Sequence, residues 1–258
     1  MVDTKSLDPR NILVMIELEL RRLRHDRTEI YTRAVQPALW LVIFGSVIGN
    51  LHAIPTGGIP YVDYITPGVL VQSMTFVSIF FGLTMVWERE SGILKKLLVT
   101  PLSRYATVIG RSMSSGVRAI FQVFIIVPIA IIIGVHFVPN PLYFICAVAV
   151  IFFSSGGFAA LSVLIASIMK SRERFMGIGQ AIIMPLFFAS NALYPVQIMP
   201  PILQDLAMVN PLSYVVDATR SLMITGDLAS LPMDMLVIAI FDVAMFTIAS
   251  LSFRRIIE

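Results

Sequence analysis

Charge is scarce in this sequence. Only 14% of its 258 residues are charged, whereas 57% are hydrophobic, and ordinary soluble domains carry about 25% charged residues. The mean hydropathy is correspondingly high, at +0.85. A soluble fold cannot hide so large an apolar fraction, so the composition indicates that most of the chain lies in a lipid bilayer.

Several features that carry chemistry in other proteins are also missing. The single cysteine, Cys146, excludes an intrachain disulfide framework and a cysteine-based zinc site, and we expect it to be a small buried apolar residue. The three histidines, His25, His52 and His136, are too scattered for a metal cluster or a base beside a nucleophile, so we expect loop or interface residues. No Gly-Lys pair occurs, and the phosphate-binding P-loop needed for ATP hydrolysis requires one. We therefore predict no catalytic residue, no metal site and no cofactor on this chain.

Long apolar runs are what the sequence does contain. About 20 helical residues cross a hydrocarbon core of about 30 Å, and six segments approach or reach that length. They are residues 34–51, 64–87, 119–137, 142–169, 175–194 and 235–253. Spans three and four are joined only by Val138, Pro139, Asn140 and Pro141, so we expect a tight antiparallel hairpin. The sequence predicts an all-α membrane protein with six spans in one domain, residues 1–258.

The basic residues predict the orientation of these spans. Eighteen of the nineteen lysines and arginines precede span one, follow span six, or lie between spans two and three or four and five. Only Arg220 falls in an alternate loop. Because lysine and arginine are retained in cytoplasmic loops, both chain ends are predicted to be cytoplasmic. The same distribution explains the basic pI without a nucleic-acid partner. The charge-rich first thirty residues contain no apolar core before a cleavage site, so no secretory signal peptide is expected.

Three segments outside the spans are candidates for function. Residues 1–33 contain an Asp8-Pro9 helix start and then apolar residues at helical spacing, which predicts an amphipathic helix on the inner membrane surface. Residues 88–118 form a cytoplasmic connection far longer than two neighbouring spans need. Residues 195–232 contain five prolines, which predicts broken helices that re-enter the outer leaflet from the exterior.

Within the cytoplasmic connection, a short helix with one apolar and one charged side is expected. Gly92 permits a turn out of the second span, and Pro101 disfavours a helix that continues through Thr100. The apolar side carries Ile93, Leu94, Leu97 and Leu98, and the other carries Lys95 and Lys96. The pattern suits docking to a cytoplasmic partner. It fits a helix that lies against lipid headgroups equally well.

Polar residues within the spans are costly in hydrocarbon and are therefore candidate functional residues. They are Gln72, Ser73, Gln180, Asn191 and Asp242. Hydrogen bonds between helices are the favoured interpretation for the amides, and an export route is the alternative. Asp242 is the one carboxylate well inside a span, and we expect it either to pair with a neighbouring helix or to be protonated. Residues 154–157, Ser-Ser-Gly-Gly, predict a close approach between helices.

Two sets of residues resemble the type-2 ATP-binding cassette (ABC) exporter permeases, most closely their daunorubicin-resistance and nodulation-export types. The first is the glutamate-rich turn, glycine, paired leucines and closing proline of residues 88–101. The second comprises Ile183, Leu186, Ala189, Ser190, Ala192, Met199, Pro200, Pro211, Leu212, Ser213, Tyr214 and Arg220. The predicted topology is also similar, so the resemblance covers nearly the whole chain.

The resemblance implies a function and partners. It implies two permease subunits, identical or paralogous, on two cytoplasmic ATPase subunits that hold ATP and Mg²⁺, in a prokaryotic plasma membrane. A lipophilic drug-like, lipid or glycan-linked substrate would be exported, and this chain would not itself be an enzyme. The resemblance assigns ATPase coupling to Glu88, Arg89, Glu90, Gly92, Leu94, Leu97 and Pro101, and the exterior-loop signature to Pro211, Tyr214 and Arg220.

Two other functions are weighed against this one. A proton-coupled secondary transporter would use Asp242 and need no ATPase. An intramembrane enzyme or anchor is a third hypothesis, but such enzymes usually carry paired acids, a histidine cluster or a Ser-Lys arrangement within their spans, and this sequence has none.

Overall fold

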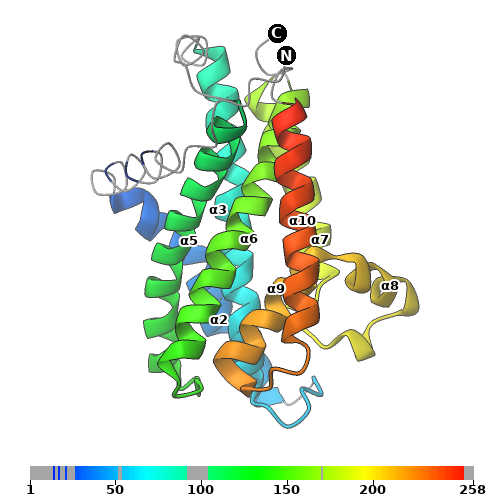
Figure 1. Cartoon of the computed structure of the whole chain (residues 1–258). Coiled ribbons are helices and arrows are strands. Elements are labelled where there is room, and N and C mark those ends of the chain that lie inside the picture. Colours follow the sequence, from blue (N-terminus) through cyan, green and yellow to red (C-terminus); the bar gives the residue numbers. More distant parts are fainter. Residues whose placement is uncertain are drawn as a thin grey trace.

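The computed structural model describes residues 14, 17, 21, 27–51, 54–91, 104–169 and 171–252, and all of its regular elements are helices (Figure 1). The long helices are α2 (Arg27–Leu51), α3 (Tyr61–Glu90), α5 (Arg104–Ile133), α6 (Pro141–Ile168), α7 (Arg172–Phe188) and α10 (Leu231–Ser252). The short elements are η1 (Val196–Ile198), α8 (Pro201–Val209), α9 (Pro211–Arg220) and the π-helical η2 (Ser221–Thr225). The predicted all-α class is confirmed for the described residues.

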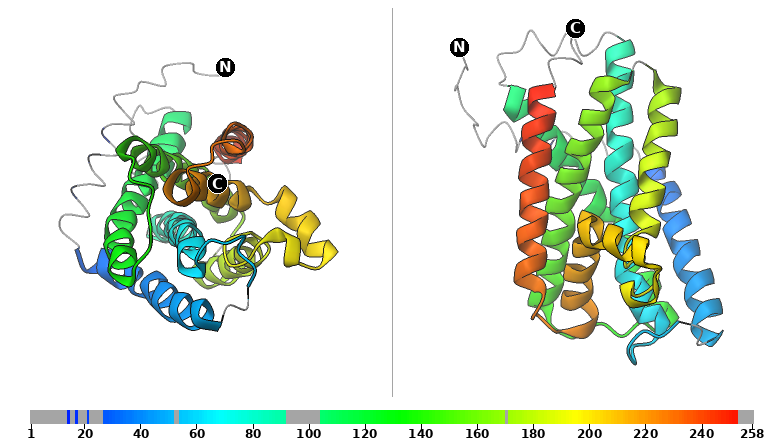
Figure 2. Two further views of the ribbon diagram at one scale, coloured as in Figure 1. Left: turned by 90° about the horizontal axis from the view of Figure 1, so that it is seen from below. Right: turned by 90° about the vertical axis from the view of Figure 1, so that its right-hand side faces the viewer.

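Helix α3 occupies the centre of the bundle. Seen along the bundle in Figure 2, α2, α5, α6, α7 and α9 surround it, and each of them contacts it. Most of its side chains between Tyr61 and Val86 are buried. The C-terminal end of α3 and the N-terminal ends of α5 and α7 lie at one end of the bundle, and α9 lies near the other (Figure 1). We call these the Glu90 end and the Tyr61 end, after the two ends of α3.

Four helices in the described part of the chain are long and apolar enough to cross a membrane. They are Tyr61–Glu90, Val108–Ile133, Pro141–Ile168 and Leu231–Ser252. A shorter apolar helix, Ala34–Gly49, coincides with the first predicted span. The fifth predicted span coincides with α7, which has only 17 residues and is about 26 Å long at 1.5 Å per residue. The chain therefore has at least four membrane-spanning candidates, and each of the six predicted spans overlaps a helix.

The helix ends differ from the predicted span ends. Helix α5 begins at Arg104, fifteen residues before the predicted start of span three, and ends at Ile133 instead of residue 137. Helix α3 continues through Glu90. Much of the predicted 88–118 connection is therefore helical extension of these two elements, because charged residues can prolong a helix beyond its apolar part. The predicted short helix around residues 93–99 lies outside the described residues, as does most of the predicted amphipathic helix in residues 1–33.

The turn between α5 and α6 confirms the predicted hairpin. Gly134 ends α5 with a positive φ of 96°, a conformation that glycine adopts without steric cost. Asn140 caps α6 by accepting a hydrogen bond from the Leu142 N–H at 3.0 Å, with Pro141 at the first helical position. The Val138 N–H donates to the Met223 carbonyl at 2.9 Å, which ties the turn to η2.

Small residues allow α6 to approach its neighbours closely, as the Ser-Ser-Gly-Gly sequence predicts. A Cβ atom added at Gly157 would lie 1.8 Å from Asp242 Oδ1 on α10. The hydroxyl of Ser155 contacts those of Ser78 on α3 at 2.8 Å and Ser115 on α5 at 2.9 Å. The expectation that Cys146 is buried is wrong, since it is exposed on the outer surface of α6. An apolar run indicates burial in lipid or protein without distinguishing the two.

Candidate functional site

The last three residues of α3 contact three different elements at the Glu90 end. Glu88 Oε2 lies 2.7 Å from Arg111 NH1 on α5, and Glu90 Oε2 lies 2.7 Å from Arg172 Nε on α7. Between them, Arg89 donates a hydrogen bond to the carbonyl of Met169, which caps α6. Consecutive residues of a helix point about 100° apart, so one turn of α3 reaches three neighbours.

The two ion pairs differ in exposure. The side chains of Arg111 and Glu88 are 15% and 19% exposed, whereas those of Arg172 and Glu90 are 50% and 30% exposed. A partly buried pair is screened little by salt, and removing one partner leaves an uncompensated charge. An exposed pair contributes little. Glu88 is therefore the stronger attachment of α3 to its surroundings.

Sequence reasoning identified the α3 side of these contacts and missed the other side. It proposed Glu88, Arg89 and Glu90 as coupling residues, while Arg111 and Arg172 counted only as charges that mark the cytoplasmic side. The remaining proposed coupling residues lie outside the described residues: Gly92, Leu94, Leu97 and Pro101. The sequence shows only that these charged residues lie near the ends of predicted helices. It does not show which arginine pairs with which glutamate.

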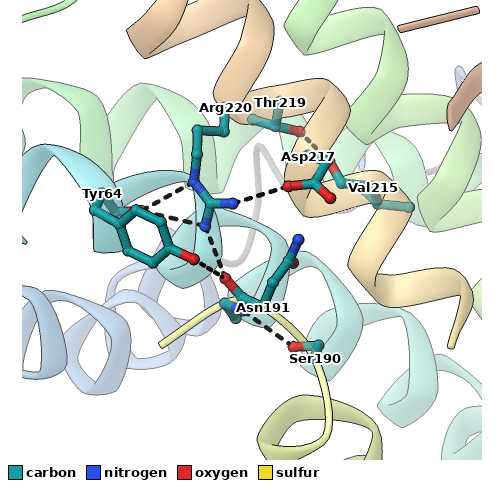
Figure 3. Close-up of polar contacts among 8 residues, drawn as sticks. Tyr64, Ser190, Asn191, Val215, Asp217, Thr219 and Arg220 are labelled. Carbon is teal, nitrogen blue, oxygen red and sulfur yellow. Dashed lines mark hydrogen bonds and ion pairs between the residues drawn. The ribbon is translucent and has the colours of Figure 1, made fainter. Parts of the chain in front are cut away.

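A second polar cluster surrounds Arg220 at the Tyr61 end (Figure 3). Arg220 is only 7% exposed, and its guanidinium carbon lies 3.9 Å from the centroid of the Tyr64 ring. Its NH2 donates to the Asn191 carbonyl at 2.8 Å and to the Tyr64 carbonyl at 3.4 Å. Its NH1 lies 2.9 Å from Asp217 Oδ1. Burial raises the pKa of the Asp217 carboxyl above its usual value, although the Arg220 charge opposes the shift.

Hydrogen bonds to main-chain carbonyls fix the segment that follows α7. The Tyr61 and Tyr64 hydroxyls donate to the carbonyls of Leu193 and Asn191, both at 3.1 Å. Asn210 Nδ2 donates to the carbonyls of Leu186 at 2.6 Å and Ala189 at 3.1 Å. Residues 189–195 are thus attached to α3 on one side and to the start of α9 on the other.

The other residues of the predicted exterior signature have local structural roles. Pro211 is the first residue of α9, and the Asn210 side chain caps that helix by accepting from the Leu212 N–H at 3.0 Å. The Tyr214 hydroxyl donates to the Met208 carbonyl at 2.6 Å, which joins α9 to the end of α8. The sequence analysis missed Asp217 and Tyr64, the side chains around Arg220. Asp217 is three residues before Arg220, so helical spacing could have indicated that pair. Tyr64 is 156 residues away, and no local pattern relates it to Arg220.

The predicted intramembrane polar residues occupy separate places. Asn191 lies in the turn after α7 instead of inside a span, because α7 already ends at Phe188. Asp242 is buried on α10 against Gly157, and its Oδ1 has no hydrogen-bond partner among the described residues. Gln180 is half-buried on α7, and Gln72 is buried on α3. The site residues thus fall into the two clusters at the ends of α3 and isolated groups between them.

His136 is in the α5–α6 turn, as expected for a loop residue. Its ring Nδ1 lies 3.2 Å from Asp63 Oδ2, and its backbone N–H donates to Asp63 Oδ1 at 3.2 Å. Asp63 is buried in the first turn of α3. The contact therefore holds the turn against the Tyr61 end of α3. His25 and His52 lie outside the described residues.

Comparison with known proteins gives matches over most of the chain. The family profile described as "ABC-2 type transporter" matches residues 10–224. A protein of Cyanophora paradoxa named as a transport permease, ycf38, is 27% identical over 219 residues, which are 82% of this chain and 73% of that protein. The daunorubicin resistance ABC transporter permease protein DrrB1 of Streptomyces coeruleorubidus is 24% identical over 204 residues, 78% of this chain and 70% of that protein. A Mycobacterium tuberculosis protein named as the doxorubicin resistance ABC transporter permease DrrC is 25% identical over 221 residues, which are 84% of this chain and 78% of that protein.

Proposed function

This chain belongs to the ABC-2 type transporter family, and from that premise we propose that it is one of two permease subunits moved by a pair of cytoplasmic ABC ATPases to export an amphiphilic, lipophilic substrate. Membership makes it a membrane permease subunit that works with a separate ABC ATPase. The number of subunits, the six spans, the direction of transport and the substrate class belong to the proposal. ATP and Mg²⁺ would be held by the partner.

The observation that carries the proposal is the three-way attachment of the Glu90 end of α3. Residues 92–103 join α3 to α5, so any force applied to them reaches both helices. The Glu88–Arg111 pair bridges these same two helices, and Arg89 and Glu90 extend the attachment to the α6–α7 junction. We infer that the ATPase contacts this connection and that the ion pairs make α3, α5 and α7 move together. A loose connection would dissipate the motion.

A charge-swap experiment tests the coupling. The chain and its partner ABC ATPase are reconstituted in proteoliposomes, and ATP hydrolysis is measured with and without the chain. Glu88→Arg and Arg111→Glu are each expected to reduce the stimulation about tenfold or more, because like charges then face each other in a partly buried site. The double variant, which restores opposite charges, should recover much of it.

The matched control is Glu173→Arg. Glu173 is an exposed glutamate in the first turn of α7, next to Arg172, and its reversal should leave stimulation near the native level. Native stimulation in both single variants at Glu88 and Arg111 would refute the coupling role. ATP hydrolysis by the chain alone, without the partner ATPase, would refute the proposal that a separate subunit hydrolyses ATP.

Labelling tests the proposed topology of six spans with both chain ends inside. In a Cys146→Ser background, single cysteines at Lys95 and Asp227 would be exposed to a membrane-impermeant maleimide in intact cells. Asp227 lies between η2 and α10, in the proposed exterior segment. We expect labelling at 227 only. Labelling at 95 from outside would invert the topology and remove the site from the reach of a cytoplasmic ATPase.

A proton-coupled transporter is the second candidate, and one observation favours it. Asp242 is a buried carboxyl with an oxygen that lacks a partner among the described residues. Uptake driven by a pH gradient in ATP-free vesicles, abolished in Asp242→Asn, would support it. We expect no such uptake, because the chain belongs to a family of ABC permeases.

A further inference from the structure

A cleft of about 340 Å³ lies between α2 and α3, which run side by side (Figure 2). Helix α3 contributes Gln72, Ser73, Phe76 and Phe80, and α2 contributes Thr32 and Gln36. Gln72, Phe76 and Phe80 recur every four residues and therefore lie on one face of α3. The volume of the cleft falls in the range of small-molecule sites, about 300–1,000 Å³.

The cleft lies in the middle part of α3, and its rim on α2 is exposed at Thr32 and Gln36. At 1.5 Å per residue, Gln72 is about 17 Å from the Tyr61 end of α3 and about 27 Å from its Glu90 end. An amide at this depth is surrounded by hydrocarbon and protein instead of water. A polar side chain there is costly and marks a candidate functional position.

Two buried polar atoms at the cleft have no partner among the described residues. They are Gln72 Oε1 and Ser73 Oγ, on side chains of residues only 4% and 1% exposed. Each unsatisfied buried group costs about 1–3 kcal/mol. The carboxamide can turn end for end with almost no change of shape, so either its N–H groups or its oxygen can face the cleft. A hydroxyl group, which donates and accepts, suits both Gln72 and Ser73.

The adjoining wall is aromatic. Phe76 and Phe80 are half-buried, their ring centroids lie 6.2 Å apart, and their planes differ by 13°. Two nearly parallel rings favour stacked or edge-on packing of a third ring. None of the described residues that line the cleft is charged, so a charged ligand would lose its hydration without gaining a counter-ion.

We propose that this cleft binds neutral hydroxylated aromatic compounds, with the hydroxyl at Gln72 and Ser73 and the ring against Phe76 and Phe80. As a substrate site it rests on the proposed export function, whereas binding itself needs no ATPase. A lipid acyl chain fits less well, because it would leave both polar groups without partners.

The test uses a pair of probes that differ in one group. 1-Naphthol and 1-methylnaphthalene have the same ring and nearly the same size, but only the first carries a hydroxyl. Binding to the full chain in lipid nanodiscs is measured by probe fluorescence, and partition into empty nanodiscs is subtracted. One well-made hydrogen bond corresponds to about a tenfold difference in affinity, so naphthol should bind about tenfold more tightly.

Variants locate the binding. Gln72→Leu should reduce naphthol affinity about tenfold, to the level of methylnaphthalene, while thermal stability is unchanged or higher because an unpartnered amide is removed. Phe76→Leu should weaken both probes. Gln122→Leu is the matched control: Gln122 on α5 is also buried with an unpartnered Oε1, but it does not line this cleft. It should bind both probes as the native chain does.

The proposal is overturned if naphthol shows no saturable binding above empty nanodiscs, if the two probes bind equally, or if Gln72→Leu and Gln122→Leu have the same effect. If naphthol binding depends on Gln72 but the chain and its ATPase export nothing, the binding site stands and the proposed function fails. The two failures are therefore distinguishable.

Discussion

The two ends of α3 are held by different kinds of interaction. At the Tyr61 end, the Tyr61 and Tyr64 hydroxyls and the Arg220 guanidinium bond main-chain carbonyls in buried surroundings. At the Glu90 end, Glu88 and Glu90 pair with arginine side chains on other helices, and one main-chain carbonyl, that of Met169, accepts from Arg89. A carbonyl is fixed by the backbone, whereas two long charged side chains can follow each other through several ångströms of helix movement.

This difference suggests a division of roles along one helix. We expect the Tyr61 end to act as the fixed point and the Glu90 end to be the part that moves. Helix movements that change access to a site commonly pivot about a rigid contact. The comparison makes a quantitative claim, namely that disrupting the Tyr61 end costs more stability than disrupting the Glu90 end.

The largest loss is expected for Arg220→Met. The variant removes the guanidinium group that donates to the carbonyls of Asn191 and Tyr64 and that pairs with Asp217, whose side chain is 40% exposed. It should lower the free energy of unfolding by about 3 kcal/mol, the lower end of the range for broken buried ion pairs. The measurement is unfolding of the purified chain in detergent, followed by circular dichroism. Arg174→Met, at an exposed arginine of α7, is the control and should cost under about 0.5 kcal/mol. Equal losses of unfolding free energy in Arg220→Met and Arg174→Met would refute the claim that the Arg220 contacts fix the Tyr61 end.

A smaller loss is expected for Glu88→Gln. The amide keeps the shape of the side chain but leaves Arg111 without its counter-charge in a partly buried site. Hydrogen bonds to charged groups contribute about 1.5–3 kcal/mol, so the same unfolding assay should give a loss of about 2 kcal/mol. A loss as large as that of Arg220→Met would mean that both ends are equally fixed, and the proposed pivot would have to be abandoned.

Tyr64→Phe separates two parts of the Arg220 cluster. The ring remains beneath the guanidinium while the hydrogen bond to the Asn191 carbonyl is lost, so we expect about 1 kcal/mol. Tyr64→Leu should cost about 1 kcal/mol more, because the cation–π contact is lost as well. Tyr214→Phe removes a shorter hydrogen bond, 2.6 Å against 3.1 Å, but at an exposed site where water can replace it, so it should cost less than Tyr64→Phe. The reverse order would indicate that α8 and α9 are held more firmly than α3.

Local patterns in the sequence determined much of the helical framework. The apolar runs, Gly134 and the Asn140-Pro141 cap define α5 and α6 because these signals act within a few residues. Residues 154–157 predicted a close approach between helices for the same reason, and the structure shows that the neighbour at Gly157 is α10. The start of α5 at Arg104 was missed, since hydropathy marks the membrane part of a helix and not its polar extension.

The contacts that form the two clusters could not be predicted in this way. Arg220 and Tyr64 are 156 residues apart. Glu88 and Arg111 lie on two helices joined by a long connection, and the composition of that connection does not predict how the two helices meet. Charge distribution indicates the side of the membrane on which an arginine lies. It does not indicate which carboxylate or carbonyl the arginine meets, because that depends on how the helices pack.

The weakest effect is expected at Glu90, and it sharpens the comparison within the Glu90 end. The Glu90–Arg172 pair is substantially exposed, and such pairs contribute about 0.2–1 kcal/mol. Glu90→Gln should therefore cost at most about 0.5 kcal/mol at low ionic strength and nothing measurable near 1 M salt, where the Debye length is about 3 Å. Arg172→Gln should behave alike, and the double variant should lose no more than either single one. A salt-independent loss above about 1 kcal/mol would instead mean that this pair is shielded from water, and the attachment to α7 would then be as firm as that to α5.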